Sequence, residues 1–294
     1  MAMEDSPYET AAKHRPAVDW GFLGGAKALG HLRTRTATIQ FIRYAKMLQA
    51  KGASVLADCQ EPLAELGLPG NRKVVPRGSA VPPHDLSIPL LSLPGLLGVP
   101  PESATADVPY LHPDPDRVEH WRRIRPGLKV GIAWQGSKVH RGDQLPPSSP
   151  PTRFAPGGII PGVTLFQPAK GPGTEQLSDE ITNPNGVGLD LGGIEAADME
   201  DTAAVIMNLD LVVTVDTAIA HVAGAIARPV WVAVAAASDW RWLQNRDDSP
   251  WYPTLLFPPA CAGDWDSLFG RLAVALAEWA RRASSERVPG TQEN

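Results

Sequence analysis

The chain has 294 residues, of which 43% are hydrophobic and 20% charged, and its formal net charge at pH 7 is −5. This length is enough for two domains of ordinary size. The acidic balance argues against nucleic acid as a general partner, because no surplus of basic side chains is available to neutralise phosphates. No apolar run reaches the ~18 residues of a membrane span, and residues 1–20 lack the apolar core of a signal peptide.

The cysteines and prolines give further information on the cellular location of the protein and on its loops. Two cysteines far apart in sequence, Cys59 and Cys261, indicate neither a metal site nor a disulfide framework. We therefore expect a cytoplasmic protein without a bound metal; a membrane-peripheral location is the alternative. The chain holds 30 prolines, which cluster in residues 81–103 and 144–162, and we expect these two stretches to be largely loop.

The first half of the chain alternates between expected helices and strands. A weak strand over 21–30 precedes a helix that ends at Gly52. The apolar positions with helical spacing in this helix are Ile39, Ile42, Tyr44, Met47 and Leu48. The elements expected after it are a strand over 54–59, a helix over 61–68, a strand over 72–78, and a strand with a loop or short helix over 84–98.

The second half repeats this alternation after a charged, proline-containing stretch. We expect strands over 129–136, 162–170, 187–193, 210–215 and 229–235, and helices over 198–209, 218–227 and 265–283. Asp198 is the expected N-cap of its helix. The apolar side of the last helix is expected to consist of Leu268, Leu272, Val274, Leu276 and Trp279, and its end to pack back toward the first domain.

Alternating strands and helices predict the α/β class, with two Rossmann-like domains that face a cleft. The expected organisation is a tail over 1–20, an N-terminal acceptor-side domain over 21–115 that is irregular at its start, a linker over 116–127 and a C-terminal domain over 128–294. Ligands of parallel sheets bind beyond the carboxyl ends of the strands. This organisation favours an enzyme of small molecules.

The stretch LVVTVDTAIAHVAGAI, residues 211–226, predicts where such a ligand lies. Residues 211–215 show no polar alternation, which is typical of a central strand buried on both faces. Asp216 and Thr217 then lie at its carboxyl end, and the helix after them directs its free N–H groups to the same space, as in many phosphate sites. His221 returns to that face one turn later. The alternative is a helix cap and a core histidine without a ligand.

Residues 199–232, with Asp216, Thr217, His221, Pro229 and Trp231, resemble the donor-binding segment of heptosyltransferase-like glycosyltransferases of the GT-B fold. The nearest resemblance is to the glycosyltransferase domain of bacterial proteins in which tetratricopeptide repeats precede it. Residues 129–143, 164–177, 238–257 and 263–273 are also similar to segments of that group. The resemblance covers about 38–294.

The resemblance implies a nucleotide-diphosphate-sugar donor as substrate. We expect no cofactor, and no metal is required, because Asp216 lacks the partner carboxylates that a divalent cation would need. Thr217 and the amide of Ala218 would hold the pyrophosphate with His221 nearby, and Asp216 would orient the turn or meet a donor hydroxyl. The residues implied beside the phosphates are Gly136, Ser137 and Lys138; those implied on the nucleoside side are Gln167 and Lys170. Trp240 and Trp242 are expected to pack under a loop, with base stacking as the alternative.

Two stretches depart from this family. Its N-terminal domain opens with a strand and a glycine-rich turn that ends in an acid, the expected general base. Thr34 and Thr36 stand here where glycines would be, and Ala37 stands where the acid would be. Residues 143–156 replace a basic, serine-containing stretch. These departures, over residues 22–37 and 144–152, have two explanations: a compensated frameshift or true divergence from the family.

The sequence therefore predicts a hexosyl- or heptosyltransferase that moves a sugar to the hydroxyl of a glycan, a lipid-linked sugar or a protein, with activity impaired by the departure at 33–37. The catalytic residues are not assigned. Three alternatives stay open: a catalytically degenerate protein that binds nucleotide sugar, an interaction module left from a repeat protein, and an epimerase of similar architecture.

Overall fold

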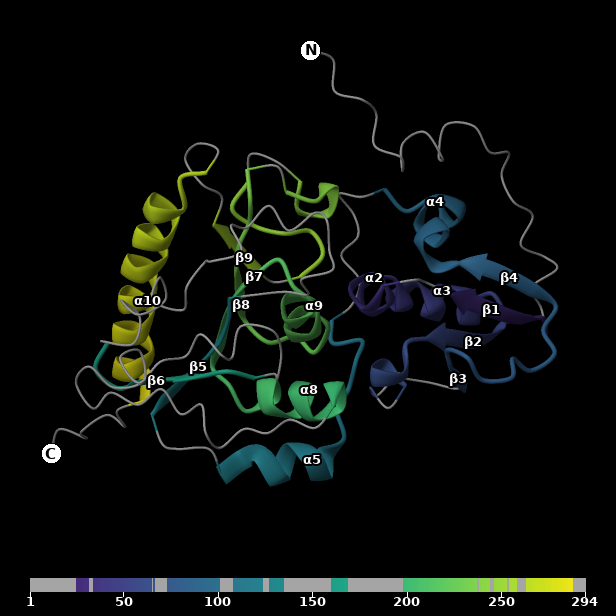
Figure 1. Ribbon diagram of the computed structural model, residues 1–294, viewed down its shortest axis with the longest axis horizontal. Helices are drawn as coiled ribbons and strands as arrows, with labels where there is room; N and C mark the ends of the chain where they lie inside the picture. Colours follow the sequence, from purple (N-terminus) through teal and green to yellow (C-terminus); the bar gives the residue numbers. More distant parts are fainter. Residues whose placement is uncertain are drawn as a thin grey trace, which may run out of the picture.

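Two parallel sheets organise the molecule (Figure 1). The computed structural model describes residues 25–31, 34–64, 66, 73–100, 108–123, 127–134, 160–168, 198–236, 238–243, 246–252, 254–257 and 263–287. The first sheet has the order β3-β2-β1-β4, with β1 (Lys27–His31), β2 (Ser54–Cys59), β3 (Lys73–Pro76) and β4 (Leu86–Pro89). The second has the order β6-β5-β7-β8-β9, with β5 (Leu128–Ala133), β6 (Val163–Phe166), β7 (Leu211–Val215), β8 (Val230–Ala233) and β9 (Thr254–Phe257). The predicted α/β class with two Rossmann-like, GT-B-like halves is confirmed.

The helical region after β1 begins earlier than its apolar pattern indicates. Helix α2 (Arg35–Phe41) runs through a 3-10 turn, η2 (Ile42–Tyr44), into α3 (Ala45–Ala50). Thr34 caps α2, since its hydroxyl accepts a hydrogen bond from the amide of Ala37 at 3.3 Å. Of the expected apolar positions, Met47 is 38% exposed, because it lies on the outer face of α3.

The remainder of the first half follows the predicted strands. The weak strand expected over 21–30 forms the central strand β1 within residues 27–31, and Gly30 lets Leu90 pack directly on it. The helix expected over 61–68 is represented in the described residues by a single 3-10 turn, η3 (Glu61–Leu63). The 3-10 turn η4 (Leu90–Ser92) and helix α4 (Leu93–Leu97) follow β4.

The stretch expected as a linker contains helix α5 (Pro115–His120) and the 3-10 turn η6 (Trp121–Arg123). Helix α5 is held against α8 (Met199–Met207) of the second half, where Arg117 pairs with Asp198 at 2.8 Å and with Asp201 at 3.2 Å. The connection is therefore docked on the second half. The domain boundaries themselves stay a prediction.

The second half confirms the predicted order of its described elements. Asp198 caps α8, since its carboxylate accepts from the amide of Asp201 at 2.8 Å. The helix α9 (Ala218–Ala225) follows β7, and η9 (Trp240–Trp242) precedes β9. The strand expected over 187–193 and the tail over 1–20 lie outside the described residues.

The last helix, α10 (Trp265–Arg287), packs on the second sheet in the part of the chain that the structure describes. Its buried residues Leu268, Leu272, Leu276 and Ala280 belong to one core with β5, β7 and β8, and Figure 1 shows α10 on the side away from the first sheet. The expectation that its end packs back toward the first domain is wrong, because residues 281–286 are exposed apart from the half-buried Ala283. Val274, expected on the apolar side, is 62% exposed.

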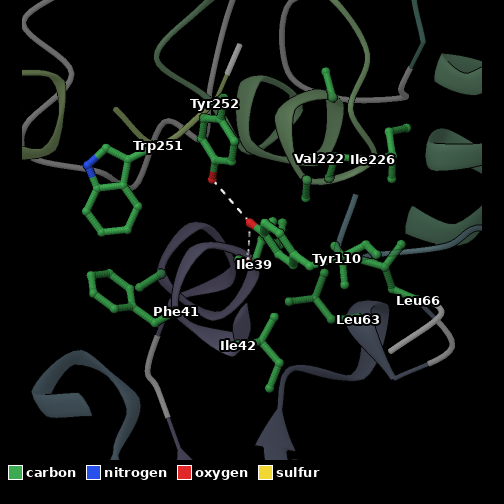
Figure 2. Close-up of a cluster of buried hydrophobic side chains, with 14 of the residues drawn as sticks. Ile39, Phe41, Ile42, Leu63, Leu66, Tyr110, Val222, Ile226, Trp251 and Tyr252 are labelled. Carbon is green, nitrogen blue, oxygen red and sulfur yellow. Dashed lines mark hydrogen bonds between the residues drawn. The ribbon is translucent and has the colours of Figure 1, made fainter. Parts of the chain in front are cut away.

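A second core is continuous from one sheet to the other. Helices α2 and α9 pack against each other, and Figure 2 shows Ile39 and Ile42 from the first half and Val222 and Ile226 from the second around Tyr110. Tyr110 is completely buried, and its hydroxyl donates to the carbonyl of Ile39 at 3.0 Å. The two halves are therefore joined by buried apolar contacts beside the site described next. In the part of the chain that the structure describes, no helix has the length and apolar character needed to cross a membrane.

Candidate functional site

The corner between β7 and α9 has the geometry that its sequence predicts. Strand β7 is central in its sheet and every residue of it is buried. Thr217 takes the N-cap position in extended conformation, but its hydroxyl lies 3.1 Å from that of Thr214 and makes no capping hydrogen bond. The cap hydroxyl therefore does not occupy the first-turn N–H groups of α9, which point beyond the carboxyl end of the sheet.

Asp216 is a carboxylate at this corner, and its side chain is 37% exposed. Its Oδ1 lies 3.5 Å from Nε2 of His221. Burial pushes the pKa of Asp216 upward, but the hydrogen bonds from His221 and Trp242 and the charge of Arg241 outweigh it, so the pKa lies below the ordinary carboxyl value. Asp216 is therefore a fixed negative charge that reaches the surface.

His221 lies behind Asp216 and inside the core, with 1% of its surface exposed. Its ring stacks on Trp242 with centroids 5.3 Å apart and an interplanar angle of 18°. The hydroxyl of Tyr252 lies 3.2 Å from Nδ1. Burial lowers the pKa of His221 more than Asp216 raises it, so the imidazole is neutral at pH 7. Direct contact of His221 with a ligand stays a prediction; in this structure its ring contacts protein groups.

The two tryptophans expected near the site differ in exposure. Trp242 is 2% exposed, and its ring covers His221, as expected for packing under a loop. Trp240 is half-buried and makes an edge contact with Trp251. Between them, Arg241 is held by Asp239 at 2.8 Å. These side chains form the wall of the corner on the η9 side.

Sequence reasoning missed two polar residues of the first half that reach this corner. Gln40 is 1% exposed, and its amide nitrogen lies 2.8 Å from Nδ1 of His221. Arg43 is 3% exposed and hydrogen-bonds the carbonyls of Gln40 and Trp251 and the hydroxyl of Tyr110, each at 3.0 Å. One signal in the sequence could have identified them. The apolar residues of 37–45 lie on all sides of the expected helix and leave it no polar face, so Gln40 and Arg43 among them must be buried.

The remaining predicted residues lie further from the corner or outside the description. Gln167 follows β6 at the same sheet edge and is half-buried; β5 separates β6 from β7, so the two strands are about 10 Å apart. Gly136, Ser137, Lys138 and Lys170 lie outside the described residues. Among the described residues, no group of three His, Cys, Asp or Glu side chains could hold a metal ion.

The first turn of α2 corrects the expectation of a damaged tight turn at 33–37. From Thr34 onward these residues form the cap and first turn of a helix. Ala37, expected at the position of the acid, is 8% exposed and belongs to the core shared with α9. The threonines at 34 and 36 are therefore part of a helix start, where they fit without the conformational freedom of glycine.

Comparisons with known proteins agree with this fold. No family model matches the chain. Over 183 residues it is 32% identical to protein FlbA of Caulobacter vibrioides, an alignment that covers 58% of this chain and 29% of FlbA. The chain therefore spans less than a third of the length of this curated relative.

Solved structures of glycosyltransferases superpose over most of the chain. A family 9 glycosyl transferase of Veillonella parvula has a TM-score of 0.55 at 10% identity and covers 92% of this chain and 91% of its own. The iron-containing heptosyltransferase TibC of E. coli has 0.54 at 13%, covering 88% and 77%. The E. coli heptosyltransferase WaaC has 0.51 at 12%, covering 87% and 99%. At these identities the similarity shows the fold.

Proposed function

We propose that the chain is a glycosyltransferase domain that moves a sugar from a nucleotide-diphosphate donor to an acceptor hydroxyl. The observation that carries the proposal is the β7–α9 corner, where a helix start without a side-chain cap and the half-buried carboxylate of Asp216 meet at the carboxyl edge of a central strand. Its place in a fold shared with heptosyltransferases supports this assignment.

The donor roles follow from charge and position. The N–H groups at Thr217 and Ala218 face the pyrophosphate, where a helix start stabilises negative charge that develops on the leaving group. Asp216 accepts a hydrogen bond from a sugar hydroxyl. In the proposal, Gly136, Ser137 and Lys138 contribute to the phosphate side.

The nucleoside side involves Gln167 and Lys170. The solved structures guide the choice of base, because TibC was solved with ADP-D-beta-D-heptose and WaaC with ADP-2-deoxy-2-fluoro heptose. Both ligands contain adenosine diphosphate. We therefore propose an ADP-linked sugar as the first donor to test, without a metal or a further cofactor. The acceptor is a glycan, a lipid-linked sugar or a protein hydroxyl.

A catalytically degenerate binding protein is the second candidate, and Ala37 favours it. General-base help is typically worth about 10²–10⁴-fold. The buried methyl group of Ala37 offers no base at the position where the family resemblance implies one. In this alternative the donor binds at the same corner and is not turned over.

Thermal unfolding in the presence of ADP, UDP, GDP and TDP and their sugar conjugates tests the binding claim. A ligand at one hundred times its Kd should add ~2.7 kcal/mol to the unfolding free energy. Asp216→Asn should reduce the shift caused by the sugar conjugate, whereas Asp266→Asn, at the exposed start of α10, should not. The absence of a shift with every nucleotide would refute the proposal. Release of free nucleoside diphosphate in the presence of acceptors then separates transferase from degenerate binder.

A further inference from the structure

The threonine that precedes α9 behaves differently from the threonine that precedes α2. Both residues take the N-cap position in extended backbone, with φ −112° and ψ 148° at Thr34 and φ −135° and ψ 172° at Thr217. The hydroxyl of Thr34 accepts a hydrogen bond from the amide of Ala37 at 3.3 Å and so caps its helix. The hydroxyl of Thr217 makes no such bond to α9. The same residue type in the same backbone region therefore caps one helix and not the other.

A contact with β7 explains the difference. The Oγ1 atoms of Thr214 and Thr217 are 3.1 Å apart. Thr214 is completely buried in the central strand, and its hydroxyl donates to the carbonyl of Val215 at 2.9 Å, so its position is fixed. Whichever hydroxyl donates within the pair, the contact keeps the Thr217 oxygen on Thr214. Thr217 is 9% exposed, so water competes little for this contact.

The contact leaves two amides at the start of α9 without an acceptor. An N-cap side chain takes the amide of the second or third helical residue. The amide of the third residue, Ala220, already donates to the carbonyl of Thr217 at 3.1 Å. The amides of Ala218 and Ile219 make no hydrogen bond within the described part of the chain. They lie at the helix start where the pyrophosphate is proposed to bind.

We infer that Thr214 is a positioning residue that keeps the start of α9 open for the donor, because it holds the Thr217 hydroxyl away from the amide of Ile219. A side-chain cap and an anion compete for the same N–H group. Without the Thr214 hydroxyl, Thr217 caps α9, and a ligand has to displace that cap before it binds. The effect on α9 exists in the ligand-free protein, whereas the effect on donor affinity rests on the proposed function.

The variant that tests this inference is Thr214→Val, which keeps the shape of the side chain and removes its hydroxyl. The hydroxyl of Thr217 should then accept from the amide of Ile219. A cap of ordinary strength leaves about one molecule in six uncapped. Hydrogen exchange of the Ile219 amide should therefore slow about sixfold, and ADP should bind about sixfold more weakly, since the binding-competent fraction falls by that factor.

Thr202→Val is the matched control. Thr202 is 3% exposed, and its hydroxyl donates to the carbonyl of Asp198 at 2.9 Å, as that of Thr214 does to Val215, but Thr202 lies in α8. This change removes an equivalent hydrogen bond and should leave both the exchange at Ile219 and the affinity for ADP unchanged.

A rescue variant separates positioning from a merely structural role. Adding Thr217→Val to Thr214→Val removes the hydroxyl that forms the cap, so exchange at Ile219 and affinity for ADP should both return toward the values of the unaltered protein. A general distortion of β7 by Thr214→Val would persist in the double variant. If Thr214→Val does not fold, Thr217→Asn is the second test, because asparagine is among the strongest N-cap residues and should slow the exchange at Ile219 and weaken ADP binding.

Amide hydrogen exchange followed by NMR reads the ligand-free protein, and calorimetry reads ADP binding. Unchanged or faster exchange at Ile219 in Thr214→Val would overturn the inference. So would a double variant that exchanges as slowly as Thr214→Val. If the unaltered chain binds no nucleotide, the proposed function fails, and exchange at Ile219 alone decides: slower exchange in Thr214→Val that the double variant reverses supports the positioning role, and equal exchange in all three proteins refutes it.

Discussion

The ring of Tyr252 packs directly on Gly224 of α9, so closely that a Cβ atom at Gly224 would lie 2.3 Å from Cγ and Cδ1 of the ring. The same tyrosine hydroxyl lies 3.2 Å from Nδ1 of His221 and 3.4 Å from the hydroxyl of Tyr110, a contact drawn in Figure 2. The absence of a side chain at position 224 thus sets how close Tyr252, in the segment before β9, comes to α9.

Gly224→Ala should destabilise the protein although alanine is the better helix former. The gain in helix propensity is ~1 kcal/mol, whereas overpacking a filled core costs about 1–3 kcal/mol and here meets a rigid ring. Gly270→Ala in α10 is the matched control, because a Cβ there meets nothing within 4 Å and the residue is exposed. Urea unfolding should show opposite signs for the two variants; the same sign in both would contradict the packing argument.

Arg43→Lys should destabilise the protein by about 2–4 kcal/mol, because a buried hydrogen-bonded charge is being mismatched. A lysine ammonium cannot reach both carbonyls and the Tyr110 hydroxyl in the geometry of the guanidinium fork. Arg122→Lys supplies the control, since Arg122 is 73% exposed and pairs with Glu119 on the surface. Its effect should stay within about 0.5 kcal/mol. Equal effects in the two variants would show that the buried hydrogen bonds of Arg43 contribute no more than the exposed pair of Arg122.

The buried imidazole of His221 predicts a pH dependence of stability. Burial lowers its pKa, so the folded state favours the neutral ring despite Asp216, and Arg43 and Arg241 act in the same direction as burial. Below pH ~6.5, the ordinary pKa of histidine, the unfolded chain binds a proton at His221 that the folded chain does not bind. The free energy of unfolding is therefore higher above this pH and decreases as the pH falls below it. The slope reaches at most ~1.4 kcal/mol per pH unit for this group.

Chemical unfolding between pH 5 and 8 measures this slope. His221→Gln removes the titrating ring and keeps a polar side chain, so its stability should depend less on pH than that of the unaltered protein across this range. An identical slope in both proteins would show that His221 titrates in the folded state as it does in the unfolded state.

The sequence predicted the second half well because its signals are local. An Asp198 cap, an unbroken apolar strand and a small-residue helix depend on neighbours a few positions away, and each formed as expected. The Gln40–His221 contact depends on two helices that are 181 positions apart in sequence, and no local pattern carries it. The predictions for the packing of α10 and for the burial of Val274 were wrong for a related reason. An amphipathic pattern shows that a helix packs on something, but it does not show which surface the helix packs on.

The start of α2 shows the limit of reasoning from a family resemblance. The sequence indicated a turn with missing glycines and a missing acid, and the structure forms a capped helix there from Thr34 onward. Threonine is a favourable N-cap residue, and Thr34 caps α2 here. The resemblance instead interpreted Thr34 as the replacement of a glycine. Local capping rules alone would have placed the helix start correctly.

Ala37→Asp, the change that would restore the expected acid, should therefore destabilise the protein and recover no transfer activity. Ala37 is 8% exposed in the core shared by α2 and α9, and an isolated carboxylate there loses its hydration. We expect a cost of about 2 kcal/mol or more, since a buried charge needs a partner. Arg35→Asp is the matched control, because position 35 is exposed in the first turn of α2, where an acid gains ~0.3–1 kcal/mol from the helix dipole. Urea unfolding and release of nucleoside diphosphate from an ADP-sugar donor should be measured on both variants. Faster release by Ala37→Asp at undiminished stability would show that position 37 faces the acceptor, and the buried helix turn assigned to it would have to be abandoned.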